Sequence, residues 1–326
     1  MYNFCTLFDS HYLSRGLALY DSLNKSCESF HLYIFAFDEI SYEKLKSYKL
    51  KNATIISLTE FEDDELLGIK PTRTPAEYCW TCTPSTIQYC LKAYKLDHCT
   101  YIDADIFFYT NVTPIFEEIG QSSIAITGHN YTKKYDQSST SGKYCVQFVY
   151  FRNDAAGISA LKWWREACID WCYARLENGK FGDQKYLDDW PERFQNVHVI
   201  QHQGAGVAPW NIQKFQLIGQ RKIQDKKTKE VSNLIFYHFH GLKYKVEKDQ
   251  IKVQAPKFDI NEEVQKEIYL PYIKQLVSID HPALNMLQFD FQKLTLPQRA
   301  ILPIHFFLKK ITLLQKIKYV FIKSIR

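Results

Sequence analysis

The chain has 326 residues, 46% hydrophobic and 24% charged, which is an ordinary composition for a globular protein of one or two domains. No uninterrupted run of 18 or more apolar residues occurs, and the first residues lack the basic and apolar regions of a signal peptide. The sequence therefore predicts neither a transmembrane helix nor secretion, and its nine cysteines are expected to be reduced thiols.

The net charge of +5 is concentrated at the carboxyl end. From Leu296 to Arg326 the chain has seven basic and no acidic residues, so this tail carries +7 and the preceding 295 residues carry −2. Apolar residues alternate with these lysines and arginines, a pattern typical of an interfacial helix on anionic lipid. The alternative is a helix packed on the globular body, with its lysines facing water.

Strands and helices alternate along the first 60 residues. The predicted strands are residues 4–8, 31–37 and 53–58, and the helices between them are residues 13–23 and a segment starting near 41. This order predicts an α/β fold, a parallel sheet covered by helices on both faces. Further along, we expect a helix over 85–95, an acidic strand over 100–109, strands over 124–126, 146–151 and 234–239, and a long helix over 155–177.

Asp103 and Asp105 interrupt the strongly apolar segment 100–109. A buried strand does not accept two carboxylates unless something balances their charge. Oxygen ligands of this kind select Mg²⁺ or Mn²⁺, and ligands of open α/β sheets bind beyond the carboxyl ends of the strands. We therefore expect the two aspartates to end a central strand and to hold a cation that binds a diphosphate. The alternative is a hairpin turn with two solvated aspartates.

A second group of polar residues follows the last predicted strand. His238 and His240 lie two apart, followed by Gly241 and Lys243, which offers an imidazole to the metal and an ammonium to phosphate oxygens. Gly241 permits close approach of the backbone. The alternative is that one or both histidines are packed core residues, since residues two apart on a strand point to the same face.

These features together resemble the GT-A fold of nucleotide-diphospho-sugar glycosyltransferases, in particular the family-8 retaining galactosyl- and glucosyltransferases. The resemblance covers roughly residues 1–245, and it is greatest to uncharacterised bacterial relatives. It divides the chain into a transferase domain over 1–250 and a helical extension over 251–326 that ends in the basic tail from about 296.

The resemblance assigns roles to single residues. Thr6, Asp9 and Tyr12 match the nucleotide pocket, where Tyr12 would stack on uracil and Asp9 would accept from the base or ribose. Asp103 and Asp105 match the metal motif, Asp103 also lying close to the ribose, and His238 fits the register of the third metal ligand, with His240 as its competitor. Asp183 and Gln184 match the catalytic pair beside the sugar, and Lys243 resembles the phosphate-binding lysine.

Two departures from the family pattern concern the donor. The family has an arginine before the metal strand, whereas residues 78–83 here contain none, and Arg73 is the candidate substitute. The family's Asn-Ala-Gly segment is replaced by Cys145, Val146 and Gln147. Both departures point to a donor sugar other than the usual galactose or glucose.

The resemblance implies a metal-dependent transferase that moves a sugar from a nucleotide-diphospho-sugar, with UDP favoured, to a hydroxyl of a glycan or lipid-linked acceptor, with retention. Together with the basic tail, the resemblance predicts that the acceptor is a lipopolysaccharide-type polysaccharide at the cytoplasmic face of the membrane. We expect no nucleic-acid partner. The alternatives are a non-catalytic nucleotide-sugar- or glycan-binding protein and a haloacid-dehalogenase-like phosphotransferase. A zinc site formed by Cys79, Cys82, Cys168 and Cys172 is a further, weaker alternative.

Overall fold

The computed structural model describes residues 1–219, 221–247, 250–254 and 257–280, and the basic tail lies outside them. The described chain forms two compact units. One contains residues 1–242 and 257–280, and the other contains residues 243–247 and 250–254. The second unit is an antiparallel hairpin of β13 (Lys243–Glu247) and β14 (Gln250–Gln254).

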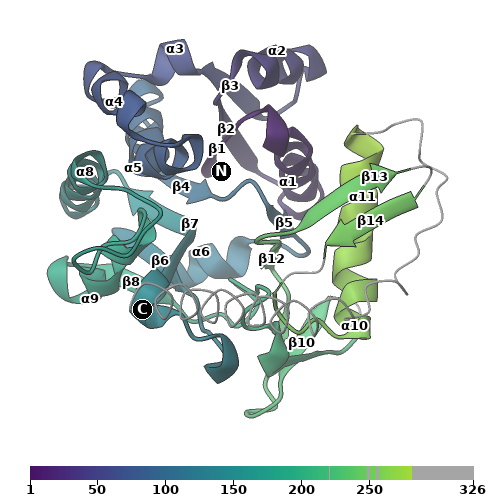
Figure 1. The fold of residues 1–326 in the computed structure, drawn as a ribbon. Coiled ribbons are helices and arrows are strands. Elements are labelled where there is room, and N and C mark those ends of the chain that lie inside the picture. The colour runs from purple at the N-terminus through teal and green to yellow at the C-terminus, as the bar shows by residue number, and fades with distance from the viewer. Residues whose placement is uncertain (220, 248–249, 255–256, 281–326) are drawn as a thin grey trace, which may run out of the picture. The chain divides into compact units, whose positions relative to one another are not determined.

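A seven-stranded sheet forms the centre of the first unit, with the strand order β3-β2-β1-β4-β7-β6-β8 (Figure 1). Its neighbouring strands pair in parallel, except that β7 is antiparallel to both β4 and β6. The strands are β1 (Tyr2–Phe8), β2 (Phe30–Ala36), β3 (Ala53–Ser57), β4 (His98–Ile102), β6 (Ile124–Gly128), β7 (Tyr144–Arg152) and β8 (Val197–Ile200). The α/β fold class predicted from the sequence is confirmed, with one strand reversed.

Both faces of this sheet are buried, as the continuous apolar runs of its strands require. Successive residues of β1 point to opposite faces. Phe4 and Phe8 belong to one core cluster, and Cys5 and Leu7 to the other. The helices are α1 (Leu13–Ser26), α2 (Glu39–Tyr48), α3 (Leu58–Phe61), α4 (Asp64–Ile69), α5 (Pro75–Ala93), α6 (Thr113–Ile119), α7 (Ser138–Ser141), α8 (Ala155–Asp170), α9 (Trp190–Arg193), α10 (Glu262–Val264) and α11 (Leu270–Asp280).

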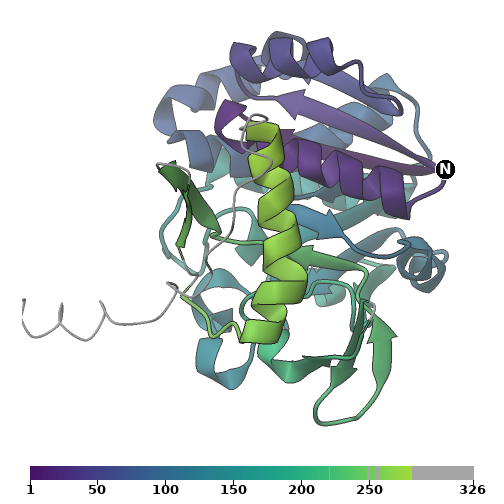
Figure 2. The same cartoon turned by 90° about the vertical axis from the view of Figure 1, so that its right-hand side faces the viewer.

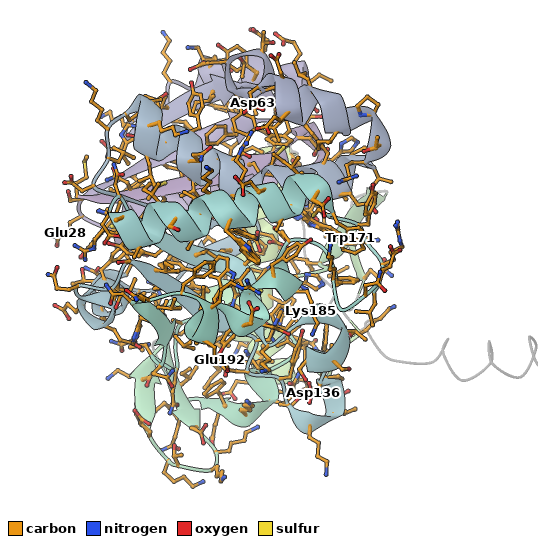
Figure 3. The ribbon with its side chains drawn as sticks, turned by 90° about the vertical axis from the view of Figure 1, so that its left-hand side faces the viewer. Glu28, Asp63, Asp136, Trp171, Lys185 and Glu192 are labelled. Carbon is orange, nitrogen blue, oxygen red and sulfur yellow. The ribbon has the colours of Figure 1, made fainter. Side chains whose placement is uncertain are left out.

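Helices α5 and α8 cover the cluster that contains Cys5. Helix α5 begins with a capping box, in which Thr74 and Glu77 bond to each other's backbone. Arg165 of α8 is nearly buried and forms ion pairs with Asp63 and Glu65 at the start of α4. Figure 3 shows α8 lying across this face, with Asp63 on one side of it and Lys185 on the other.

Helix α11 packs beside α1 on the opposite face of the sheet (Figure 2). Gln275 of α11 donates a hydrogen bond to Asp21 of α1 at 3.0 Å, and the Tyr272 ring stacks on Phe239 with centroids 3.8 Å apart. A turn with π-helical bonding, Gln265–Tyr269, joins α10 to α11. Of the described residues in the predicted extension, the helices over 262–280 thus pack on the sheet domain, whereas 251–254 are a strand of the hairpin unit. No helix among the described residues is long and apolar enough to cross a membrane.

The acidic segment predicted as one strand is divided into two. β4 ends at Ile102, and β5 (Ile106–Phe108) leaves the main sheet to pair antiparallel with β12 (Phe236–His238). The two aspartates lie in the turn between β4 and β5. The Ile106 N–H closes this turn by donating to the Asp103 carbonyl. A further small sheet, β11 (Val231–Asn233), β10 (Lys222–Asp225) and β9 (Phe215–Leu217), was not predicted, and helix α8 ends at Asp170 instead of residue 177.

Candidate functional site

Asp103 and Asp105 lie in the turn that follows the central strand β4. The Asp103 N–H donates to the Gln147 carbonyl of β7 at 3.1 Å, and the Phe239 N–H donates to the Asp105 carbonyl at 2.9 Å. The backbone on both sides of the turn is therefore held by neighbouring strands. Asp105 is buried and Asp103 half-buried, so the expectation of two carboxylates at the end of a central strand holds and that of two solvated ones does not.

His238 brings its imidazole to these two carboxylates. It ends β12, opposite Ile106 of β5, which is the residue that follows the turn. Its Nε2 lies 3.1 Å from Oδ1 of Asp105 and 3.7 Å from Oδ2 of Asp103. Residues more than 130 positions apart thus meet because β5 and β12 pair.

The three side chains fit a divalent cation. Their ligand atoms all lie within 4.8 Å of one another. Two ligands bound at right angles to one ion, about 2.1 Å from it, are about 3 Å apart, close to the distances from Nε2 to the two carboxylates. Two carboxylate oxygens and one imidazole nitrogen suit Mn²⁺ or Mg²⁺ and leave positions open for other ligands.

His240 lies beside this group rather than in it. The centroids of the His238 and His240 rings are 5.6 Å apart, and both rings contact Trp210 edge-on. Burial and the charge of His238 lower the pKa of His240. Of the two candidate ligands, the geometry favours His238.

Gln147 orients the His238 ring from behind. Its Oε1 lies 2.9 Å from Nδ1 of His238, and its Nε2 donates to the Thr127 hydroxyl at 3.3 Å. An oxygen at that position accepts a hydrogen only from a protonated Nδ1, so Nε2 faces the carboxylates. Gln147 has no exposed surface. In known metal sites, a hydrogen-bond acceptor behind the ring fixes the tautomer of the metal-binding histidine, and Gln147 lies in that position relative to His238.

The pKa shifts of Asp103, Asp105 and His238 are those expected where a positive charge is favoured. Burial raises the pKa of Asp103, and the nearby Asp105 charge adds to the rise. Burial also opposes ionisation of Asp105, but the charge and hydrogen bond of His238 lower its pKa. The pKa of His238 is raised, because the attraction of Asp105 outweighs burial. Positive charge is thus favoured beside the two carboxylates, and a divalent cation would supply it.

Asp183 and Gln184 begin the 3₁₀ helix Gln184–Asp189. The Asp183 carboxyl is buried, and burial together with the Asp103 charge raises its pKa to about 7. Trp164 donates its indole N–H to the Asp183 carbonyl at 3.0 Å, which anchors the segment to α8. Gln184 is half-buried. Asp183 thus lies close enough to Asp103 to feel its charge, and the catalytic role of Asp183 and Gln184 stays a prediction.

The residues predicted to bind the nucleotide lie in β1 and in the turn that follows it, and their role stays a prediction. Thr6 is fully buried, and its hydroxyl has no hydrogen-bond partner within the described part of the chain. Asp9 caps the 3₁₀ helix Ser10–Tyr12 by accepting from the His11 N–H at 3.0 Å. Tyr12 is 43% exposed. Cys79 links this end of the site to Asp183, because the charges of Asp9 and Asp183, after burial, raise the pKa of its thiol to about 12.

The two expected cations, Arg73 and Lys243, have different outcomes. Arg73 donates to the Ile169 carbonyl at 3.0 Å and to the Tyr173 hydroxyl, so its guanidinium is used at the end of α8. It does not take the place of the family's arginine near the donor. Lys243 is the first residue of β13 in the hairpin unit, and its phosphate-binding role stays a prediction.

The cysteines form no four-thiolate site in the described ranges. Cys79, Cys82, Cys168 and Cys172 are free thiols, and they do not make up a group with metal-ligand spacing there. A different trio, Cys5, Cys90 and Cys99, does have its sulfur atoms within 4.8 Å of one another, in the core between β1, α5 and β4. All three have no exposed surface and fill that core as small apolar side chains.

Sequence reasoning did not predict the contact of Gln147 with His238, and it did not assign Arg15 to the site. Gln147 is the one amide in an otherwise apolar run from Cys145 to Phe151, and a polar residue in such a strand needs a partner. Arg15 lies three residues after Tyr12, and side chains at that spacing are neighbours at the start of a helix. Both features are visible in the sequence, but neither identifies the contacting residue, which is His238 for Gln147 and Leu242 for Arg15.

Comparison with solved structures identifies the fold. The fold matches a crystal structure of the galactosyltransferase LgtC in complex with donor and acceptor sugar analogues, with a TM-score of 0.50, 12% identity, and coverage of 91% of this chain and 98% of that one. It also matches the apo form of the glycosyltransferase GlyE of Streptococcus pneumoniae TIGR4, with a TM-score of 0.50, 13% identity, and coverage of 88% of this chain and 65% of that one. The protein has the GT-A glycosyltransferase fold.

Sequence comparison then gives the family. The chain is 30% identical over 310 residues to the uncharacterised protein YfnD of Bacillus subtilis (strain 168), covering 94% of this chain and 98% of YfnD. It is 34% identical over 250 residues to the uncharacterised protein YfnF of the same strain, covering 73% of this chain and 80% of YfnF. The chain belongs to the family of these two proteins. No model of a protein family matches it.

Proposed function

We propose that this protein is a metal-dependent glycosyltransferase that moves a sugar from a nucleotide-diphospho-sugar to a hydroxyl of a glycan or glycolipid. The observation that carries the proposal is the meeting of Asp103, Asp105 and His238 at the end of the central strand of a GT-A fold. Ligands of open α/β sheets bind at that edge. UDP is the favoured nucleotide, because the exposed Tyr12 ring at the end of β1 suits stacking on a uracil.

Each group has a part in the reaction. Asp103, Asp105 and His238 would hold Mn²⁺ or Mg²⁺, which when bound would supply Lewis-acid stabilisation of the charge on the leaving diphosphate. Asp9 and Tyr12 orient the nucleoside. Gln147 keeps Nε2 of His238 directed at the carboxylates.

The stereochemical proposal is retention. The acceptor hydroxyl then attacks from the face of the leaving group, a phosphate oxygen takes its proton, and Gln184 stabilises the positive charge that develops on the sugar ring. Inversion would need a carboxylate base on the other face. Asp183, with a pKa of about 7, is suited to that task at neutral pH, so the anomer of the product decides between the two roles.

The experiment is a metal-dependent turnover assay. The full-length protein is incubated with a panel of UDP-, GDP-, dTDP- and CMP-sugars in Mn²⁺ or in EDTA, and release of the free nucleotide is measured. A transferase without its acceptor is expected to hydrolyse one sugar nucleotide slowly in Mn²⁺ and not in EDTA, and Asp105→Ala is expected to lose this activity. Tight binding without any hydrolysis would favour the non-catalytic alternative. Release of inorganic phosphate from simple phosphate esters would favour the phosphotransferase.

The proposed acceptor is lipid-linked, of the lipopolysaccharide type, at the cytoplasmic face of the membrane. This rests on the charge of residues 296–326 alone, since those residues lie outside the described ones. Each basic residue near an anionic surface contributes about 1 kcal/mol of binding. Replacing Lys309, Lys310, Lys316 and Lys318 by Gln in the full chain is therefore expected to release the protein from phosphatidylserine vesicles in a flotation assay. Equal flotation of both proteins would contradict the proposal.

A further inference from the structure

Arg15 contacts Tyr12, at the predicted nucleoside end of the site, and Leu242, close in sequence to the metal ligand His238. It lies in the first turn of α1, and its guanidinium carbon is 4.6 Å from the centroid of the Tyr12 ring. Its Nη2 donates to the Leu242 carbonyl at 2.8 Å. Leu242 follows His238 by four residues. The Arg15 side chain therefore contacts both Tyr12, the residue predicted to stack on the base, and the segment that carries the predicted metal ligand.

The charge of Arg15 is not neutralised by a paired carboxylate. Within the described ranges no Asp or Glu lies within 4.0 Å of its guanidinium, and the bond to Leu242 is its one hydrogen bond there. A guanidinium has five N–H donors, so most of them remain for a ligand. The Arg15 charge also lowers the pKa of Asp105, after the larger effects of burial and the two histidines, which places it near the metal motif.

The order of these groups matches the order of groups in a nucleoside diphosphate. The base, the ribose and the phosphates follow one another, and the proposed function puts the base at Tyr12 and the metal-bound phosphates at Asp103, Asp105 and His238. A cation between those ends faces phosphate oxygens. Guanidinium is suited to that task, because its planar donors form paired hydrogen bonds with phosphate.

We propose that Arg15 binds a phosphate oxygen of the nucleoside diphosphate and supplies the cation that the stretch 78–83 lacks. This inference rests on the proposed function, because it requires a nucleotide at the site. Arg73, the other candidate cation, is bound to Ile169 and Tyr173. Arg15 therefore sets the affinity for the diphosphate part of the donor, whichever sugar is attached.

The test compares two ligands that respond in opposite directions to this charge. Isothermal titration with Mn²⁺ alone and with UDP in saturating Mn²⁺ is carried out on the native protein, Arg15→Gln, Arg15→Lys and the control Arg193→Gln. Arg193 also lies over an aromatic ring, Trp163 at 4.4 Å, and pairs with Asp189, but belongs to α9. A glutamine at position 15 retains a donor for Leu242 while removing the charge.

Arg15→Gln is expected to bind UDP about 10- to 100-fold more weakly, the effect of one charge-assisted hydrogen bond. Its affinity for Mn²⁺ alone is expected to stay equal or rise, because a repelling charge is gone. Arg15→Lys should lose less UDP affinity, and Arg193→Gln none. Equal weakening of Mn²⁺ and UDP binding would show a structural tether instead and overturn the inference, as would unchanged UDP binding in Arg15→Gln. Failure of the native protein to bind UDP would instead overturn the choice of UDP in the proposed function, an outcome distinct from a loss confined to the Arg15 variants.

Discussion

Gln147 accepts a hydrogen bond from Nδ1 of His238 at 2.9 Å, across 91 positions of sequence. This contact fixes which imidazole nitrogen faces the two aspartates. Partners of this kind change metal affinity by about 10- to 100-fold when removed. Gln147→Ala is therefore expected to weaken Mn²⁺ binding by that factor, measured by titration followed by electron paramagnetic resonance.

Gln147→Glu is the informative companion variant. Its carboxylate also accepts from Nδ1, so it should bind Mn²⁺ at least as well as the native protein. Gln216→Ala, on the exposed face of β9, is the neutral control. If the Ala and Glu variants lost the same affinity, the effect would come from packing of the buried strand and not from orientation of the ring.

His238 and His240 provide a second test of the metal ligands. His238→Ala removes an atom 3.1 Å from the Asp105 carboxylate, and the loss of one of three protein ligands should lower Mn²⁺ affinity by more than tenfold. His240→Ala, two residues beyond the end of β12 and beside the same Trp210 ring, should change it less than threefold. The reverse order of the two variants, in the same titration, would make His240 the ligand.

The raised pKa of Asp183 predicts that this buried carboxyl lowers the stability of the folded protein at neutral pH. Its folded value of about 7 exceeds the ordinary 3.8, so between these pH values the native protein holds a proton that the unfolded chain has lost. Stability therefore falls as pH rises from about 4 to 7. Asp183→Asn should remove that fall and gain, as an upper limit, on the order of 4 kcal/mol at pH 8 and little at pH 4. Urea denaturation in EDTA at both pH values measures it.

Asp170→Asn is the control for that experiment, because the Asp170 side chain is 77% exposed. Its unfolding free energy should differ from that of the native protein by the same small amount at both pH values. A gain for Asp183→Asn that did not depend on pH would mean that the buried carboxyl is not the origin of the effect.

Gly204 positions the strand that carries His238. Its carbonyl accepts the N–H groups of Ile235 and Phe236, and a Cβ there would lie 1.8 Å from the Asn233 carbonyl oxygen. Since backbone cannot move aside cheaply, Gly204→Ala is expected to cost more than about 2 kcal/mol of stability. Gly68→Ala, in α4 with open space around it, should gain about 0.5–1 kcal/mol. Thermal unfolding of the two variants measures the contrast.

The sequence predicted those parts of the site that depend on a single strand. Two aspartates in an apolar run are visible without a structure, and so is the α/β alternation that places them at a sheet edge. The register that puts Gln147 behind His238, and the reversal of β7 that makes it possible, depend on pairing between distant segments. Arg15 was not assigned for the same reason, because its partner Leu242 lies 227 residues away.

The central claim is a nucleotide-sugar site that depends on a metal held by Asp103, Asp105 and His238. Its most direct test is a thermal-shift screen of UDP-, GDP-, dTDP- and CMP-sugars, with and without Mn²⁺, on the native protein and Asp105→Ala. A ligand that binds only the folded state raises the midpoint by mass action. We predict a rise with a UDP-sugar that requires Mn²⁺ and is absent in Asp105→Ala. No rise with any nucleotide, or the same rise in the variant, would contradict the claim.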